Sequence, residues 1–313
     1  MHTPIFRAEW WERRRAGILS PMDALAPFTA RRTICLSRSE LLDAGVSVRS
    51  IAAAVHSGRL IRARRGWYLP PHAPGLVVQA VRVGGRATCE TALKAYGVWV
   101  PGSSIPHVAL PPGASRLRAP DNRGASLLRA GPTRAAELHW RPWSGTHVEK
   151  WRVSRVDAIV HAAWCVAPDD FVAVLDSALH KGVIGGADLA DVRERAPVER
   201  RRCFDRLDAR AESGTESLVR LALRAAGLAV RPQARIAGVG RVDLLVEGKI
   251  VVEVDSEEWH SDEEARTRDY QRDLVLFRAG FVVVRVSWFQ AMFRRSEVVE
   301  AVRAAVAAVR RRR

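Results

Sequence analysis

The sequence predicts a multidomain α+β protein. A winged helix-turn-helix is expected near the N-terminus, followed by a mixed middle region and a C-terminal α/β domain around a mixed sheet. Three observations lead to this prediction. Two short amphipathic helices flank Gly45 and precede a basic strand pair, which is the order of a winged helix. Residues 206–313 alternate helix-like and strand-like apolar patterns. A chain of 313 residues that is 48% hydrophobic is long enough for two or three domain cores.

The composition favours a polyanionic partner. Lys and Arg number 50 against 34 Asp and Glu, which gives a net charge of +16. This balance predicts binding to nucleic acid before membrane. No apolar stretch approaches the ~20 residues that cross a bilayer, and the N-terminus lacks the apolar core of a signal peptide, so we expect a cytoplasmic protein. The cysteines show no CxxC spacing, which argues against a zinc knuckle or a disulfide framework.

Four segments are expected along the chain. They are an extension at 1–30, a winged-helix DNA-binding domain at 31–72, a mixed α/β middle region at 73–205 and an α/β domain at 206–313. The last of these should form a complete core on its own, starting near Asp205. In the middle region the histidines lie at irregular spacing, and we interpret them as structural or surface residues: His107, His139, His147, His161 and His180.

The winged helix is predicted from two helices and a basic hairpin. Residues 37–45 have a capping-box start and a glycine stop, and residues 47–58 have apolar residues at helical spacing. An Arg-rich tip beside Gly66 forms the wing. A plain helical hairpin in a larger protein is the alternative. If the segment binds DNA, the expected contacts are Ser47, Arg49, Ser50, Arg62, Arg64 and Arg65.

The candidate catalytic residues lie between 241 and 273. Two short apolar strands are joined at residues 247–249, and they contain Asp243 in the first and Glu253 and Asp255 in the second. A carboxylate inside a buried strand is costly unless it is compensated, and a divalent cation compensates several at once. A three-residue turn would place Asp243 opposite Glu253. The alternative is that these acids lie on the wet face of an antiparallel hairpin.

The order of these elements resembles the PD-(D/E)xK nuclease superfamily, in its branch related to very-short-patch-repair endonucleases. The resemblance covers about residues 208–313 and implies a restriction-endonuclease-like fold. One departure is that the superfamily pattern has Lys two residues after the Glu, where this chain has Asp255. Asp is usual there in the branch itself. The matching residues are Glu216, Asp243, Glu253, Asp255, Trp259, His260, Arg268, Asp269, Arg272 and Asp273.

The resemblance implies a DNA endonuclease that depends on Mg²⁺ (or Mn²⁺) and hydrolyses phosphodiester bonds. Asp243 and Glu253 would hold the metal. Asp255 would complete the shell or accept a proton through a water, and His260 would act as acid or base. Glu216 is either catalytic or the capping-box partner of Ser213.

Two arginines on the last predicted helix before Gly280 have open roles. Arg268 and Arg272 lie one helical turn apart. They either touch phosphate or pair with Glu264 or Asp269 along the helix.

The stretch GRLIRARRGWYL resembles the winged helix of abortive-infection-type antitoxins. The competing hypothesis is therefore a DNA-binding transcriptional regulator or antitoxin whose nuclease-like domain does not cleave. The absent Lys, and Ser256 where the branch usually has Gly, favour that hypothesis. Retention of the acids and of His260 favours the enzyme. A third interpretation is a toxin–antitoxin, repair or defence protein with a partner protein. The DNA target and the oligomeric state stay open.

Overall fold

The computed structural model confirms the predicted mixture of helices and mixed or antiparallel sheets. Two compact units make up the chain, Met1–Ala92 with Ser103–Asp157 and Leu93–Gly102 with Ala158–Arg313. None of the described helices is both long and apolar enough to span a bilayer. The structure describes residues 35–127, 135–144, 149–255 and 263–311, without the side chains of residues 263–269.

The first unit contains the predicted winged helix. Its sheet has the order β1-β3-β2. Ser37 caps α3 in the predicted capping box, because its hydroxyl accepts the Glu40 N–H while the Glu40 carboxylate accepts the Ser37 N–H. Gly45, with φ of 73°, makes the turn between the two helices. The elements are β1 (Leu36–Ser37), α3 (Arg38–Asp43), α4 (Val48–His56), β2 (Ile61–Arg64) and β3 (Trp67–Leu69).

A second small sheet follows in the first unit, with the order β4-β5-β6. Strand β4 is antiparallel to β5, and β5 is parallel to β6. The elements are α5 (Gly75–Val83), β4 (Arg86–Ala87), α6 (Cys89–Ala95), β5 (His107–Ala109) and β6 (Glu137–His139).

The second unit begins with a group of helices. Helices α7 and α8 come first in this group, and α9 and α10 follow them. The bounds are α7 (Arg155–Cys165), α8 (Pro168–His180), α9 (Gly186–Arg195), the 3₁₀ turn η3 (Val198–Arg200), α10 (Arg201–Phe204) and α11 (Gly214–Ala225).

A four-stranded mixed sheet forms the C-terminal part of this unit, with the order β10-β9-β8-β7. Strands β7, β8 and β9 are antiparallel in succession, whereas β10 runs parallel to β9 after the helix α12 (Glu263–Arg278). A parallel pair needs such a crossover. The strands are β7 (Val230–Ile236), β8 (Gly240–Val246), β9 (Ile250–Val254) and β10 (Val282–Val286).

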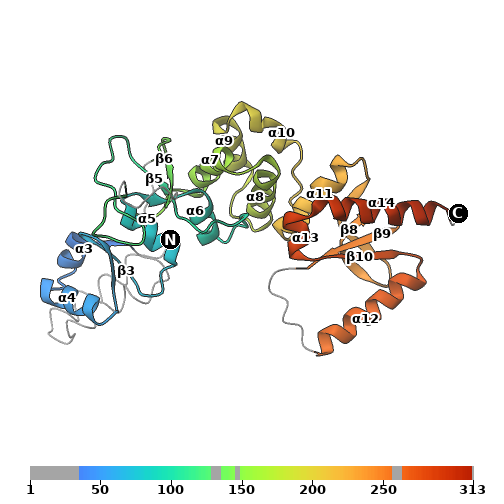
Figure 1. Ribbon diagram of the computed structural model, residues 1–313, viewed down its shortest axis with the longest axis horizontal. Helices are drawn as coiled ribbons and strands as arrows, with labels where there is room; N and C mark the ends of the chain where they lie inside the picture. Colours follow the sequence, from blue (N-terminus) through green and yellow to red (C-terminus); the bar gives the residue numbers. More distant parts are fainter. Residues whose placement is uncertain (1–34, 128–134, 145–148, 256–262, 312–313) are drawn as a thin grey trace. The chain divides into compact units, whose positions relative to one another are not determined.

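Helices cover both faces of this sheet (Figure 1). On one face, Leu244 and Val252 pack against α11, α13 (Trp288–Phe293) and α14 (Arg295–Arg311). On the other, Val251 and Leu245 pack with Leu276 of α12. The alternation of buried residues along β8 and β9 therefore supplies two apolar layers, as expected for a strand that is buried on both sides.

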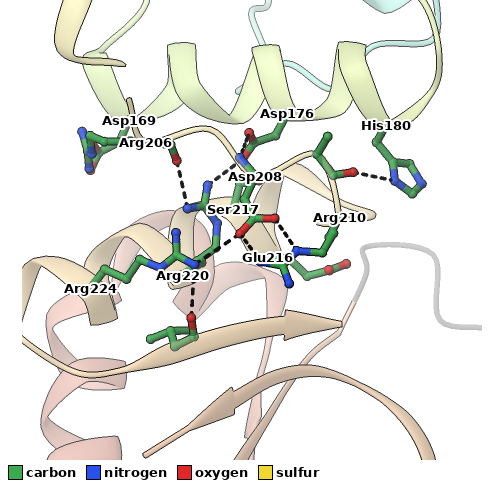
Figure 2. Close-up of polar contacts among 12 residues, drawn as sticks. Asp169, Asp176, His180, Arg206, Asp208, Arg210, Glu216, Ser217, Arg220 and Arg224 are labelled. Atoms are coloured by element: carbon green, nitrogen blue, oxygen red, sulfur yellow. Dashed lines mark hydrogen bonds and ion pairs between the residues drawn. The ribbon is translucent and has the colours of Figure 1, made fainter. Parts of the chain in front are cut away.

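A buried ion pair joins α8 to α11 (Figure 2). The Arg220 guanidinium donates to the Asp176 carboxylate at 2.7 Å, and the two side chains are 0% and 1% exposed. The same carboxylate accepts hydrogen bonds from the Ser217 hydroxyl and the Asp208 N–H, each at 2.7 Å. Burial raises the pKa of Asp176 despite the neighbouring guanidinium, so its ionised form depends on these donors.

This network crosses the domain boundary that the sequence predicted near residue 205. Helix α8 lies before that boundary and α11 after it. The segment Leu93–Gly102 also belongs to this unit, because the Trp99 N–H donates to the Ser177 hydroxyl at 2.9 Å. A fragment that begins near Asp205 would lose Asp176 and leave the Arg220 charge buried. The compact unit is thus larger than the segment 206–313.

We expect Asp176→Ala to destabilise the second unit by about 3–5 kcal/mol, because it strands a buried guanidinium. A matched control is Asp169→Ala, which removes a half-exposed ion pair with Arg206 and should cost at most ~1 kcal/mol. Urea unfolding of the full chain measures both values. Equal losses for the two variants would contradict the central role of the buried pair.

Candidate functional site

Two carboxyl groups meet across β8 and β9. Leu244 pairs with Val252 and Leu245 with Val251, so one further step along the ladder sets Asp243 opposite Glu253. This is the arrangement that the three-residue turn predicts. The two side chains are hydrogen-bonded to each other. The Asp243 Oδ2 atom also accepts the Val254 N–H at 2.9 Å, which fixes its orientation.

Burial favours the protonated form of this pair of carboxyl groups. It raises the pKa of Glu253 to about 7, and the charge of Asp243 raises it further in the same direction. Burial also raises the pKa of Asp243, against the opposing effect of the Val254 N–H. Ionising both of two carboxyl groups in contact costs free energy, because the two negative charges repel each other. A positive charge close to the pair would therefore favour its ionised form.

One oxygen of the pair is left without a hydrogen bond. Among the described residues, the buried Glu253 Oε1 accepts none. An Arg272 nitrogen lies 3.0 Å from it, close enough for an ion pair but without the alignment of a hydrogen bond. A buried oxygen of this kind is costly unless an ion or a water satisfies it.

Arg272 forms an ion pair with the carboxylate site. Its guanidinium is an ion-pair partner of Glu253 and also donates to the Arg241 carbonyl oxygen. Along the same sheet face, Arg285 is paired with Glu253 in register and binds Asp273 of α12 at 2.9 Å. Helix α12 thus contributes counter-charges to this face of the sheet. In the described structure the Arg272 charge is directed at Glu253.

Glu216 stands beside the pair at the start of α11. It is buried, and its carboxylate accepts the Gln233 amide N–H at 2.7 Å and the Glu212 N–H at 3.1 Å. Its backbone N–H binds the Ser213 hydroxyl, so the helix cap is also present. Burial, followed by the charge of Asp243, raises the pKa of Glu216. Both roles considered for Glu216 from the sequence are compatible with this position.

Gln233 is a site residue that the sequence patterns did not reveal. It lies between Pro232 and Ala234, which pair with β8, and has φ of 50°. A left-handed residue in a strand disturbs its regular pleat. The side-chain amide binds Glu216. Only its place opposite Asp243 in the register could have indicated this residue, and that register was not known from the sequence.

The remaining predicted site residues are placed less fully. Asp255 follows β9 directly, and its N–H donates to the Val286 carbonyl oxygen at 2.8 Å. Within the described residues, no third acid forms a compact three-ligand cluster with Asp243 and Glu253. His260 falls in residues 256–262 and lies outside the described part, as does the side chain of Arg268.

The first unit presents the residues predicted to contact DNA on α4 and the wing. Ser47 caps α4 by accepting the Ser50 N–H at 3.0 Å, and its hydroxyl contacts the Ser50 hydroxyl at 2.8 Å. Arg49 is exposed on the first turn. The two serines therefore orient the helix start, and the Arg49 side chain is available to a phosphate or a base edge.

The three wing arginines differ in burial. Arg62 and Arg65 are exposed, whereas Arg64 is half-buried with its guanidinium packed close to Gly84. Burial lowers the pKa of Arg64, and the nearby Arg118 adds to this effect. Arg62 and Arg65 can reach DNA without rearrangement. The main contribution of Arg64 is to the packing of the wing.

Two family models match separate parts of the chain. Residues 216–306 match REase_MTES_1575, a restriction endonuclease-like family, and residues 23–71 match AbiEi_4, described as "Transcriptional regulator, AbiEi antitoxin". The first range contains Glu216, Asp243 and Glu253, and the second contains the winged helix. A search of curated proteins gives no significant match. Both resemblances identified from the sequence are thus confirmed, and the C-terminal domain is restriction endonuclease-like.

Without added metal, the stability of the second unit should fall as pH rises from about 4.5 to about 7. The pKa of Glu253 is raised from 4.5 to about 7, so in that window the folded state keeps a proton that the unfolded state releases. Glu253→Gln should reduce this decline, with a smaller part left from the raised pKa values of Asp243, Glu216 and Asp176, and should add on the order of 1–3 kcal/mol at pH 8. Denaturant unfolding in chelator at pH 5 and pH 8 measures the effect. The exposed Glu297→Gln variant should behave as wild type, and an equal decline in Glu253→Gln would contradict the assignment.

Replacing both Arg62 and Arg65 by Ala should flatten the salt dependence of DNA binding by the full chain. Each lost phosphate contact reduces the slope of log K against log salt by about 0.9. The Arg64→Ala control removes one positive charge from a half-buried position. It should change the free energy of unfolding more than the slope of log K against log salt. Fluorescence anisotropy over a salt series gives the slopes. Equal slopes for the double variant and wild type would remove the wing from the DNA contact.

Proposed function

We propose that this protein is a metal-dependent nuclease that hydrolyses phosphodiester bonds in DNA and reaches DNA through its winged helix. The observation that carries the proposal is the contact between Asp243 and Glu253, with the buried Glu253 Oε1 left without a hydrogen bond. A fold gains no stability from two buried acids in contact. Their retention on facing strands is explained if they bind a cation.

The residues present fit a hard divalent cation. Carboxylate oxygens are the donors that Mg²⁺ and Mn²⁺ prefer, and the site offers the carboxylates of Asp243 and Glu253. Such an ion, when bound, lowers the pKa of a coordinated water and offsets negative charge on the reacting phosphate. A restriction endonuclease-like domain usually binds a divalent metal, which supports the same conclusion. Asp255, at the end of β9, is the proposed further ligand or proton acceptor.

The surrounding residues hold these acids in place. The Val254 N–H orients Asp243, and Arg272 balances the charge of Glu253. Glu216 is held by the Gln233 amide with its raised pKa, which suits a group that exchanges a proton with a nearby water. His260 stays our proposed acid or base on the segment after β9. Arg268 is the arginine of α12 still proposed to contact phosphate.

A second function rests on the match of residues 23–71 to antitoxin regulators. In it, the chain binds DNA as a transcriptional regulator or antitoxin and its nuclease-like domain does not cleave. Asp255 occupies the place of the superfamily Lys, so no lysine is present there to activate water. A toxin, repair or defence protein would be the partner in this case. Cleavage decides between the two functions.

Purified full-length protein should nick or cut DNA in Mg²⁺ or Mn²⁺ and stop in chelator. Glu253→Gln and Asp243→Asn should each abolish turnover, and the double variant should be scarcely worse, because ligands of one ion act as a unit. DNA binding should persist in both. His260→Ala should slow cleavage by ~10²–10⁴-fold if it transfers a proton.

Two controls separate this activity from a contaminant. Glu297→Gln, on the exposed surface of α14, should cleave as wild type does. Mg²⁺ should raise the melting temperature of wild type at pH 8 but not that of Glu253→Gln. Equal cleavage by wild type and Glu253→Gln points to a contaminating nuclease. DNA binding without cleavage of single- or double-stranded substrates, and without Mg²⁺ stabilisation, supports the regulator instead.

A further inference from the structure

A second group of ligand side chains lies in the first unit, apart from the carboxylate site. The thiol of Cys89 and the imidazoles of His107 and His139 bring ligand atoms within 4.8 Å of one another. All three side chains are buried, with exposures of 0%, 4% and 6%. Cysteine and histidine together are the donors typical of zinc sites, whereas Mg²⁺ prefers oxygen.

The small sheet brings these residues together from distant parts of the sequence. Parallel pairing sets His107 opposite Glu137 and Ala109 opposite His139, so the two histidines lie on the same face of neighbouring strands, two positions apart. Strand β4 ends beside them, because the Thr88 N–H donates to the His107 carbonyl oxygen at 3.0 Å. Cys89 is the next residue, at the start of α6.

The distance between the two imidazoles fits one ion. His107 Nδ1 and His139 Nε2 are 3.3 Å apart. Two nitrogens bound tetrahedrally at about 2.0–2.1 Å from zinc are separated by about 3.3–3.4 Å. A hydrogen bond between neutral imidazoles would give a similar distance, and so the thiol beside them is the distinguishing feature. A thiol contributes little to an imidazole pair but binds zinc strongly as a thiolate.

The other nitrogen of His107 faces a carboxylate. Its Nε2 lies 3.7 Å from Glu90 Oε1, and Glu90 is itself only 9% exposed. A histidine that binds zinc through one nitrogen commonly directs the other N–H at a carboxylate or carbonyl, which fixes the ring and its tautomer. The Thr91 hydroxyl accepts the His107 N–H at 2.9 Å and holds the same residue from the backbone side.

We propose that Cys89 Sγ, His107 Nδ1 and His139 Nε2 bind a structural Zn²⁺ ion, with Glu90 positioning His107. The ion joins the start of α6 to β5 and β6, two strands that are separated by residues 110–136 and meet over only three residue pairs. So short a pairing is marginal without further restraint. The sequence interpretation of His107 and His139 as ordinary structural or surface histidines is replaced here by a ligand role.

The first test is the metal content of the full-length protein purified without added zinc. Elemental analysis should give about one zinc per chain after dialysis against a weak chelator, because thiolate and imidazole ligands hold zinc tightly. Cys89→Ser and His139→Gln should each lose most of it. Asp243→Asn should retain it, which separates this site from the carboxylate site. Zinc below a tenth of the protein concentration in wild type, with normal folding, would overturn the proposal.

Cobalt substitution keeps the proposal testable if a ligand variant folds poorly. Co²⁺ bound through Cys89 should show thiolate-to-cobalt absorption in the near ultraviolet, whereas oxygen ligands give none. Cys35→Ser and Cys203→Ser are matched controls, since burial raises the pKa of both thiols and that of Cys35 to about 12, and they should retain the band. A band about twice as intense as one thiolate gives would also support the site and would indicate that a second thiolate binds the same ion. No band in folded wild type would overturn it.

Glu90 provides a finer test of the same geometry. Glu90→Gln keeps the shape of the side chain and removes its charge, so zinc should bind about 10–100-fold more weakly while the cobalt band keeps its position. Competition with a chromogenic chelator measures the affinity. An unchanged affinity would remove Glu90 from the site, and loss of the band would contradict a role limited to positioning.

Discussion

The contact between the Asp243 and Glu253 carboxyl groups is the constraint around which the C-terminal domain is arranged. Strand pairing places both acids in a buried row, where burial and mutual repulsion raise the pKa of Glu253 to about 7. Two neighbouring groups moderate that repulsion, the Val254 N–H on Asp243 and the Arg272 guanidinium on Glu253. The site is therefore destabilising when empty, which is the expected property of carboxylates that are positioned for a cation.

Helix α11 connects this site to the helices that precede it. Glu216 and Arg220 lie one turn apart on it, and the first is beside Asp243 while the second is buried against Asp176 of α8. Because side chains four residues apart point the same way along a helix, the Arg220 pair sets how α11 is rotated and thereby where Glu216 lies. The helices of the middle region thus contribute to the geometry of the carboxylate site, although none of their residues belongs to it.

The sequence predicted what depends on local pattern. The strands around Asp243 and Glu253 follow from alternation of apolar residues, and their opposition follows from a three-residue turn. What it did not predict depends on long-range pairing. Gln233, a left-handed residue in β7, reaches Glu216, and the buried contact of Asp176 with Arg220 joins α8 to α11 across 44 positions of the sequence. Cys89, His107 and His139 have no characteristic spacing, because they come from one helix start and two strands that are far apart in the sequence.

The two ligand sets differ in chemistry in a way that would keep their ions apart. Asp243 and Glu253 offer only hard oxygen, which would suit an exchangeable Mg²⁺ or Mn²⁺ ion. Cys89 and the two imidazoles offer sulfur and nitrogen inside a closed core, where zinc binds far more tightly than magnesium. If both proposed sites bind metal, a chelator of moderate strength would remove the first ion and leave the second. Loss of cleavage in chelator would then not require loss of structure.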